Sequence, residues 1–186
     1  MLLYIKTEAA YFLDIFIIAD LPKQFYRTGV YKIKKSMLKI GDKAPEFSGT
    51  DSTGKTIKLI DFKGSKLVLY FYPKDNTPGC TAEACDLRDN YQRFLSMGYK
   101  VVGVSKDNEK SHKAFSDKFN LPYPLISDKE AVILKLFDAW GRKKFMGREY
   151  DGIIRKTFVI DETGVISDII EKVDTKAHSE QILGNR

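Results

Sequence analysis

The sequence predicts an α/β fold in which a mixed central β-sheet lies between two layers of helices, a three-layer sandwich. Short apolar runs alternate with longer amphipathic segments, two of these runs are apolar at nearly every position, and the last two are joined by a tight turn instead of a helix. Strands that are apolar throughout are typical of a sheet covered on both faces. The chain has 186 residues, 43% of them hydrophobic, which is enough for one packed domain.

The predicted elements follow in chain order. Residues 51–54 (Asp-Ser-Thr-Gly) and 161–164 (Asp-Glu-Thr-Gly) have the composition of hairpin turns, so each is expected to join two short antiparallel strands. Strands are predicted at residues 67–72, 101–105, 125–127, 157–160 and 165–170. Helices are predicted at residues 78–97, 108–119, 131–137 and 178–183.

The chain divides into a head segment, residues 1–36, and a folded domain, residues 37–186. The head is apolar first and then rich in Lys and Tyr, whereas the regular pattern begins after Met37. Two interpretations stay open. The head is an added helix that packs on the domain or on a partner, or it is a poorly ordered stretch upstream of a true start at Met37.

Composition and charge exclude several classes of protein. The formal net charge of +6 is not gathered in a basic stripe with interleaved aromatic residues, so we expect no nucleic-acid partner. The most apolar stretch, residues 11–21, is shorter than a membrane span of about 18 residues and is interrupted by Asp14 and Asp20. It also lacks the unbroken apolar middle of an export signal, so we expect no membrane anchor and a cytoplasmic protein. In a reducing cytosol two lone cysteines are reactive or inert thiols rather than a permanent disulfide.

The two cysteines, Cys80 and Cys85, lie in the segment Thr-Pro-Gly-Cys-Thr-Ala-Glu-Ala-Cys, residues 77–85, shortly after the first fully apolar run. Thr77 suits the N-cap of the predicted helix and Pro78 its first position, which places Cys80 at the third position. Unpaired backbone N–H groups and the positive end of the helix dipole then surround its sulfur. Such surroundings favour the thiolate, which is the nucleophilic form.

The spacing of the cysteines sets a geometric problem. On a helical wheel Cys80 shares a stripe with apolar residues such as Ala84 and Leu87, at the sheet edge where open α/β folds place their sites. Cys85 lies about 140° away, which argues against two inert core cysteines. In a helix the two Cα atoms are about 8–9 Å apart, more than the ~7 Å that a disulfide allows. We therefore predict that a bond between them requires the first turns of the helix to unwind.

The remaining polar candidates are less specific. Arg155, just before a predicted strand, is the best candidate for a cation beside the thiolate, although a surface arginine is an equal alternative. Glu83 is assigned a modest interaction with the helix dipole, with proton transfer as the alternative. His112 and His178 are expected to be solvated, and residues 142–144 (Arg-Lys-Lys) to form a basic surface loop. Two cysteines alone do not supply the roughly four ligands of a zinc site, so we expect no metal.

The cysteine segment resembles a known family. Residues 73–80 (Pro-Lys-Asp-Asn-Thr-Pro-Gly-Cys) are similar to the Pro-x-x-x-Thr-x-x-Cys motif of the peroxiredoxins, and residues 81–85 resemble the subgroup called peroxiredoxin Q or bacterioferritin comigratory protein. The resemblance runs from about residue 37 to residue 183. Further segments that carry it are residues 41–47, 140–144 and 152–161.

The resemblance implies a thioredoxin-like fold and a thiol peroxidase without a metal or organic cofactor. It implies that Cys80 attacks the O–O bond of a hydroperoxide and becomes a sulfenic acid. Cys85 then resolves this acid to an intramolecular disulfide, and thioredoxin or a similar dithiol protein reduces the disulfide by exchange. We expect a monomer or a weak dimer. A thiol–disulfide oxidoreductase and a redox sensor that does not turn over peroxide are the alternatives.

Three further residues receive roles from the resemblance. Thr77 is expected to hydrogen-bond the peroxide or the sulfur, Arg155 to stabilise the thiolate and polarise the peroxide, and Pro73 to shield the pocket wall. The Thr77 oxygen then has two expected partners, because a capping hydroxyl would also accept the N–H of Cys80.

Overall fold

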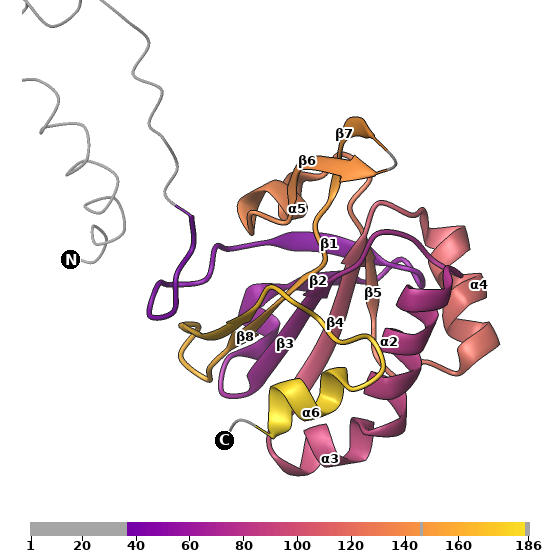
Figure 1. Ribbon diagram of the computed structural model, residues 1–186. Coiled ribbons are helices and arrows are strands. Elements are labelled where there is room, and N and C mark those ends of the chain that lie inside the picture. The colour runs from indigo at the N-terminus through magenta and orange to yellow at the C-terminus, as the bar shows by residue number, and fades with distance from the viewer. Residues whose placement is uncertain (1–36, 146, 185–186) are drawn as a thin grey trace, which may run out of the picture. The chain divides into compact units, whose positions relative to one another are not determined.

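The computed structural model describes residues 37–145 and 147–184, and both interpretations of the head segment, residues 1–36, lie outside the described residues. A seven-stranded sheet forms the centre of the described domain (Figure 1). In spatial order its strands are β2 (Thr56–Lys58), β1 (Ser48–Asp51), β5 (Leu125–Ser127), β4 (Tyr99–Ser105), β3 (Lys66–Phe71), β8 (Lys156–Ile160) and β9 (Ile166–Ile170). The three central strands β5, β4 and β3 are parallel, and the outer strands are antiparallel to their neighbours, so the sheet is mixed as predicted.

Helices cover both faces of the sheet. They are η2 (Leu59–Phe62, a 3₁₀ turn), α2 (Pro78–Asp89), α3 (Tyr91–Ser96), α4 (Glu109–Phe119), α5 (Val132–Leu136) and α6 (His178–Leu183). Buried residues of α2, α3, α4 and α6 pack on one face, and those of η2 and α5 pack on the other. The predicted three-layer α/β architecture is therefore confirmed.

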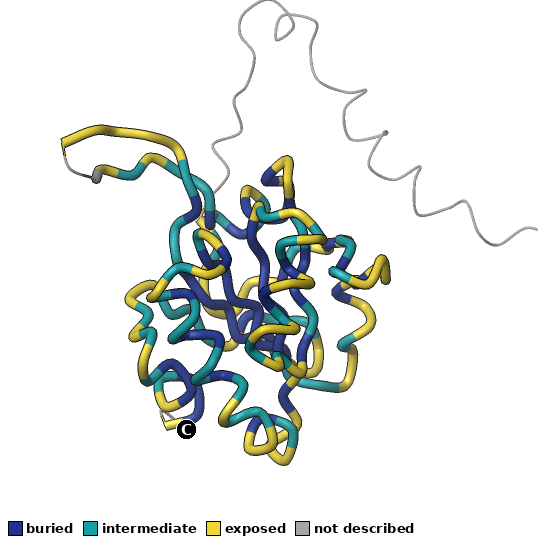
Figure 2. Tube along the Cα trace, turned by 90° about the vertical axis from the view of Figure 1, so that its right-hand side faces the viewer, coloured by how far each residue is buried: buried dark blue, intermediate teal, exposed yellow. Residues whose placement is uncertain are grey.

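The central strand β3 supplies side chains to both faces, because successive residues of a strand point in opposite directions. On one face Leu67, Leu69 and Phe71 belong to what we call the apolar core, with Phe137 and Phe158. On the other face lies the cysteine core, whose members include Val68, Tyr70, Tyr72, Cys80, Ala84, Leu87 and Phe94. Figure 2 shows that the trace through the middle of the described domain is buried.

The predicted helix at residues 78–97 is two helices, α2 and α3, and this part of the prediction was wrong. The break is at Asn90, which has φ −96° and ψ 7°. Its side-chain amide donates to the carbonyl oxygen of Asp86 at 3.0 Å. Asparagine competes in this way for backbone hydrogen bonds, and an apolar periodicity does not reveal it.

Residues 142–144 are part of a strand, so the prediction of a basic surface loop was also wrong. They belong to β6 (Trp140–Phe145), which pairs antiparallel with β7 (Arg148–Ile153) in a hairpin outside the main sheet (Figure 1). Charged residues occupy half of each strand, and β7 is exposed along most of its length. A strand without an apolar face carries little sequence signal. The hairpin leads directly into Arg155.

Candidate active site

Cys80 lies where the chain leaves the carboxyl end of β3 and enters α2. Thr77 is the N-cap residue of α2 with extended backbone angles, and Pro78 follows it, as predicted. The carbonyl oxygen of Thr77 accepts the N–H of Thr81 at 2.8 Å, which closes the first turn around the cysteine. The Cys80 side chain is 2% exposed and belongs to the cysteine core. The sulfur therefore sits in the first turn of a helix and is almost wholly desolvated.

Arg155 is brought to this sulfur by the pairing of β3 with β8. The register places Phe71 opposite Lys156, so Arg155, the residue just before β8, lies at the point where β3 ends. Its guanidinium Nη2 donates to Cys80 Sγ at 3.1 Å. The alternative of a surface arginine is excluded, because the side chain is only 21% exposed and is directed at the cysteine.

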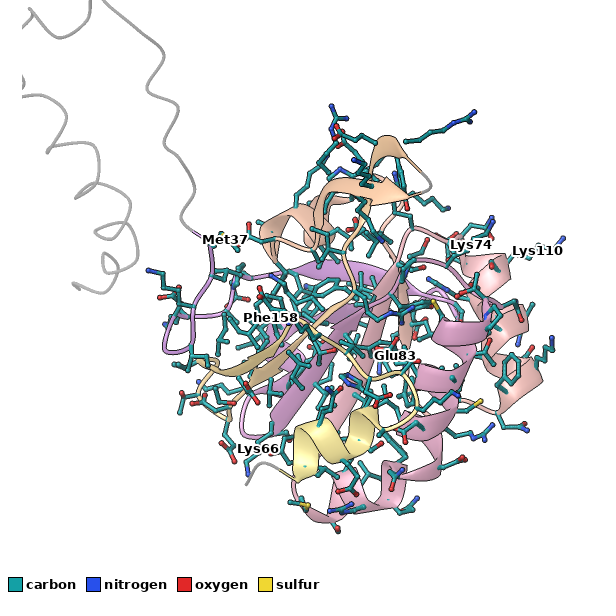
Figure 3. The ribbon with its side chains drawn as sticks, in the orientation of Figure 1. Met37, Lys66, Lys74, Glu83, Lys110 and Phe158 are labelled. Carbon is teal, nitrogen blue, oxygen red and sulfur yellow. The ribbon has the colours of Figure 1, made fainter. Side chains whose placement is uncertain are left out.

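Glu83 is a member of the site that sequence analysis undervalued. It lies one turn after Cys80 on α2, is fully buried, and accepts a hydrogen bond from Arg155 Nη1. In Figure 3 it lies between α2 and α6. Burial raises the pKa of Glu83 to about 7 even though the Arg155 charge opposes the shift. The assignment of a modest helix-dipole interaction was therefore too weak, and its position at the edge of the apolar stripe was the signal.

His178 at the start of α6 is buried, and the expectation that it is solvated was wrong. Its Nε2 lies 2.9 Å from the Thr157 hydroxyl and its Nδ1 lies 3.2 Å from Gln181 Oε1. Burial lowers the pKa of His178 to about 4, so the ring is neutral at pH 7. Its Nε2 is also 3.9 Å from Glu83 Oε1, an oxygen without a hydrogen-bond partner among the described residues.

Thr77 and Pro73 belong to the turn between β3 and α2, and both are half-buried. The Thr77 hydroxyl donates to the carbonyl oxygen of Lys74 at 3.0 Å. It makes no capping hydrogen bond, so the expected bond to the N–H of Cys80 was wrong. The turn has folded back on itself, which gives the hydroxyl a nearer acceptor. Because the hydroxyl donates in this bond, its oxygen can still accept a hydrogen bond.

Cys85 is half-buried, and both cysteines are free thiols. It lies on the same continuous helix as Cys80, since α2 runs from Pro78 to Asp89 without a break. The helical separation predicted for the two cysteines therefore applies to the structure. A bond between the two sulfurs requires this part of α2 to change conformation.

A second buried polar cluster lies beneath the turn. Asp75 is 4% exposed and His112 on α4 is 0% exposed, so the expectation of a solvated His112 was also wrong. The imidazole Nδ1 is 3.0 Å from Asp75 Oδ2. His112 stands three residues before the buried Phe115, and this spacing on the apolar face of α4 was a signal in the sequence.

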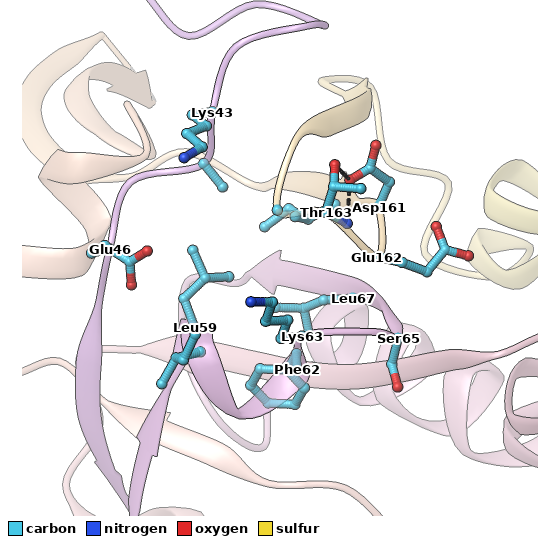
Figure 4. A pocket seen from close by; sticks show the side chains of 14 residues that line it. Lys43, Glu46, Leu59, Phe62, Lys63, Ser65, Leu67, Asp161, Glu162 and Thr163 are labelled. Atoms are coloured by element: carbon cyan, nitrogen blue, oxygen red, sulfur yellow. Dashed lines mark hydrogen bonds between the residues drawn. The ribbon is translucent and has the colours of Figure 1, made fainter.

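No cluster of metal-ligating side chains occurs within residues 37–145 and 147–184. In the same part of the chain, no helix has the length and apolar character needed to cross a bilayer. A separate hollow of about 190 Å³ lies at the opposite end of β3 (Figure 4). Its lining includes Leu59, Phe62, Lys63 and Glu162, and neither cysteine reaches it. Both cysteines therefore lie away from this hollow.

The chain is similar to known proteins over most of its length. Residues 40–169 match the model of the AhpC/TSA family. Peroxiredoxin Bcp of Bacillus subtilis (strain 168) is 45% identical over 146 residues, which cover 78% of this chain and 93% of the relative.

Two solved structures are similar over most of the chain. A cysteine mutant of PrxQ from Xylella fastidiosa gives a TM-score of 0.75 at 34% identity and covers 81% of this chain and 96% of that one. The bacterioferritin comigratory protein of Xanthomonas campestris, solved in a study of its alkyl peroxide reduction activity, gives 0.71 at 35% identity, with 75% and 88% covered.

Proposed function

The chain belongs to the AhpC/TSA family as a peroxiredoxin of the Bcp, or PrxQ, group, and we propose that it reduces hydrogen peroxide and organic hydroperoxides at Cys80. The observation that carries this proposal is the contact of 3.1 Å between the Arg155 guanidinium and Cys80 Sγ at the start of a helix. A fixed cation and free backbone N–H groups stabilise a thiolate, and a buried thiolate has lost the water that would lower its reactivity.

In the first step the Cys80 thiolate attacks one oxygen of the peroxide. An S–O bond forms and the O–O bond breaks, so sulfur is oxidised to a sulfenic acid and the peroxide is reduced. The leaving oxygen departs as an alkoxide or hydroxide and takes a proton from solvent to give an alcohol or water. Arg155 donates hydrogen bonds where the negative charge moves from sulfur to oxygen, and such preorganised donors stabilise a transition state.

The Thr77 hydroxyl and Pro73 shape the space in front of the sulfur. The hydroxyl donates to Lys74 O, and its oxygen is left to accept a hydrogen bond from an incoming O–H. Pro73 has no N–H to offer and forms an apolar wall of the turn. In this role Thr77 orients the peroxide, and Pro73 limits the access of water to Cys80.

In the second step the Cys85 thiol attacks the sulfenic sulfur. An S–S bond forms, the S–O bond breaks, and the hydroxyl leaves as water with the thiol proton. Because α2 holds the two cysteines too far apart, its first turns unwind before this bond forms. A dithiol protein of the thioredoxin type then supplies two electrons and returns both cysteines to thiols.

The proposed setting is the cytoplasm, where such reductants keep thiols reduced. Two free cysteines and the absence of any disulfide in the described residues suit a reducing compartment. We also propose that the protein is a monomer or a weak dimer. Sedimentation of the reduced protein over a range of concentrations tests this assembly state.

Peroxide consumption in the presence of a thioredoxin system tests the activity. Cys80→Ser is expected to abolish it, and Cys85→Ser to permit one turnover and then stop. A Cys80→Ser variant that still consumes peroxide would end the assignment. A redox sensor is distinguished by wild-type protein that is oxidised once and does not continue to consume peroxide.

Amide hydrogen exchange tests the unwinding of α2. Residues of the first turns of α2 are expected to lose protection when the disulfide forms, while β3 keeps its protection. Equal protection of residues 80–85 in the reduced and oxidised proteins would contradict the proposed conformational change.

A further inference from the structure

The cluster formed by Asp75, His112 and Tyr72 plays no part in the proposed chemistry, although it lies beneath the turn that carries the cysteine. All three side chains are at most 4% exposed. Tyr72 ends the run that includes β3, Asp75 lies in the turn, and His112 comes from α4. Burial of ionisable groups is unfavourable unless they are paired and hydrogen-bonded. The contacts of this cluster therefore decide which of its members carry a charge.

The hydrogen bonds of His112 define its charge. Nε2 lies 3.2 Å from the carbonyl oxygen of Ile126, which only accepts. Nδ1 lies 3.0 Å from Asp75 Oδ2. The Tyr72 hydroxyl, 3.3 Å from Nδ1, is engaged at 2.7 Å as a donor to Asp75 Oδ1. Both ring nitrogens face acceptors, and only an imidazolium donates from both.

His178 provides a contrast within the same molecule. One of its ring nitrogens faces the Thr157 hydroxyl, which can donate, and the other faces the Gln181 side chain. A neutral ring satisfies this pair of partners. The two buried histidines are thus built for different protonation states, although both are fully enclosed.

Asp75 is held by further hydrogen bonds besides those to His112 and Tyr72. Its Oδ2 accepts from the Ser111 hydroxyl at 2.7 Å, and its backbone N–H donates to Asp107 Oδ2 at 3.0 Å. Burial acts to raise the pKa of Asp75, but hydrogen bonds and the charge of His112 outweigh it, and the pKa is lowered. The exposed carboxylate of Glu109 also interacts electrostatically with His112.

The anchored residue leads directly to the reacting one. Asp75 is followed by Asn76, which has φ +56°, and then by Thr77, the N-cap of α2. A non-glycine residue in the left-handed region persists where its surroundings determine the backbone. The position of Cys80 relative to Arg155 therefore depends on how rigidly Asp75 is held.

We propose that His112 is a positioning residue for peroxide reduction: as a buried imidazolium it anchors Asp75 and so holds the turn at residues 73–77, and with it Cys80, in the geometry that reacts with peroxide. The inference rests on the proposed function of Cys80. His112 does not touch the peroxide, and it acts through Asp75. The anchor lies upstream of α2, so it stays in place when the first turns of that helix unwind for disulfide formation.

This arrangement separates the two oxidation steps. Attack on peroxide requires the folded turn and is expected to slow by about 10- to 100-fold in His112→Gln, as expected for a small misplacement of a reacting group. Disulfide formation with Cys85 requires unwinding and is expected not to slow. Rapid-mixing measurements of the two steps after addition of hydrogen peroxide provide both rates.

Two control variants test whether a lost surface charge or a loosened core slows the reaction in the same way. Asp117→Asn breaks the exposed pair of Lys113 with Asp117 on the same helix and tests loss of a charge on α4. Phe94→Leu removes buried volume from the cysteine core on α3, away from the turn. Both are expected to react with peroxide as the wild type does. An equal slowing in Phe94→Leu would overturn the positioning role.

Nitrogen NMR of the wild-type protein tests the charge without any variant. Both ring nitrogens of His112 are expected to carry protons because both face acceptors, whereas His178 is expected to carry one. A single protonated nitrogen on His112 overturns the inference, even if His112→Gln does not fold. A folded His112→Gln protein that is oxidised as fast as the wild type also overturns it. If wild-type Cys80 itself is not oxidised, the proposed function fails and this inference fails with it.

Discussion

The two cores that meet at β3 differ in kind. On one face Leu67, Leu69 and Phe71 pack in a cluster of apolar residues. The buried Lys156 side chain places its ammonium group over the Phe158 ring of this cluster. On the other face Tyr70 and Tyr72 pack in the core that contains Cys80. Four buried ionisable residues, Asp75, Glu83, His112 and His178, lie at the site end on the side of this second core.

The apolar core is built of aromatic contacts that require no partner of a particular charge. Phe137 packs against Phe71 and Phe158 with ring centroids 5.5 and 5.3 Å apart, and Phe71 and Phe158 are 6.1 Å apart. Such rings bury large apolar areas and stabilise the fold directly. The cysteine core instead holds groups whose burial is unfavourable and whose charges are set by neighbours. Stability therefore depends largely on one face of β3, and the proposed reactivity on the other.

On the side of the cysteine core, the largest expected effect on the rate of Cys80 oxidation comes from replacing Arg155. In Arg155→Met the rate of Cys80 oxidation is expected to fall about 10²- to 10³-fold, the range seen when a preorganised donor is removed. Arg155→Lys is expected to recover only part, because one guanidinium holds Cys80 and Glu83 through different nitrogens and an ammonium does not reproduce that fork. Arg142→Met on the exposed hairpin is the matched control, and a similar loss there would contradict the role of Arg155.

Substitutions in the apolar core are expected to change the stability of the protein but not its activity. Leu69→Ala removes a fully buried side chain and is expected to lower the free energy of unfolding by about 2–5 kcal/mol. Its peroxidase rate per folded molecule is expected to remain that of the wild type. Denaturant unfolding and activity measured on the same samples check both statements. Ile60→Ala, at a 57% exposed position, is the control and is expected to change stability by less than about 0.5 kcal/mol.

The sequence was sufficient for the elements that carry strong local signals. The apolar runs predicted β3 and β4, and Thr77 and Pro78 predicted the start of α2. The helical wheel placed Cys80 on the stripe of α2 that carries Ala84 and Leu87, and all three are buried. For Arg155, a position beside the thiolate and a position on the surface were equal alternatives. The pairing of Phe71 with Lys156 then placed it at the sulfur. That pairing joins residues far apart in the chain, and local patterns do not contain it.

The buried ionisable residues were predicted worst. His112 and His178 lie in polar stretches of sequence, so composition suggested solvation, whereas contacts from distant elements enclose both rings. The predicted hydrogen bond of the Thr77 hydroxyl was wrong for a different reason. A capping preference names the residue, but the fold of the turn decided that Lys74 O is its acceptor. In each case the partner comes from tertiary structure or from the local path of the backbone.

The pH dependence of stability sharpens the contrast between the cores. The pKa of Glu83 is raised from 4.5 to about 7, so from about pH 4.5 to 7 the stability that this group contributes is lost as pH rises. The pKa of His178 is lowered from 6.5 to about 4, so from about pH 6.5 to 4 the stability that this group contributes is lost as pH falls. Each slope is about 1.4 kcal/mol per pH unit, and the two oppose each other where the windows overlap.

Removing one group exposes the slope of the other. His178→Gln is expected to become more stable relative to the wild type by roughly 3 kcal/mol as pH falls from about 6.5 to 4.5. Denaturant unfolding at a series of pH values measures this difference, in which other titrating groups cancel. The double variant Glu83→Gln/His178→Gln lacks both groups, so its stability relative to the wild type is expected to change little over the same pH range. Parallel pH profiles for His178→Gln and the wild type would contradict the assignment.

The smallest expected effect comes from two glycines that allow close approach, one under each core. A Cβ at Gly49 would lie 2.3 Å from Ile126 Cγ2 in the apolar core. A Cβ at Gly103 would lie 2.7 Å from the Tyr70 ring in the cysteine core. Overpacking of this kind costs about 1–3 kcal/mol, so Gly49→Ala and Gly103→Ala are expected to destabilise the protein by similar amounts.

Activity is expected to distinguish these two glycine variants. Tyr70 stacks on Tyr72 with ring centroids 5.4 Å apart, and Tyr72 donates to Asp75 in the turn before Cys80. A displaced Tyr70 ring therefore disturbs the turn, whereas a displaced Ile126 side chain moves within an apolar environment. Gly103→Ala is expected to slow Cys80 oxidation several-fold and Gly49→Ala to leave it unchanged, when both are measured well below their unfolding transitions. Equal slowing in the two variants would mean that the two cores are not functionally separate, because packing changes on either face would then reach the sulfur alike. A wild-type rate in Gly103→Ala would contradict the link from Tyr70 through Tyr72 to the turn.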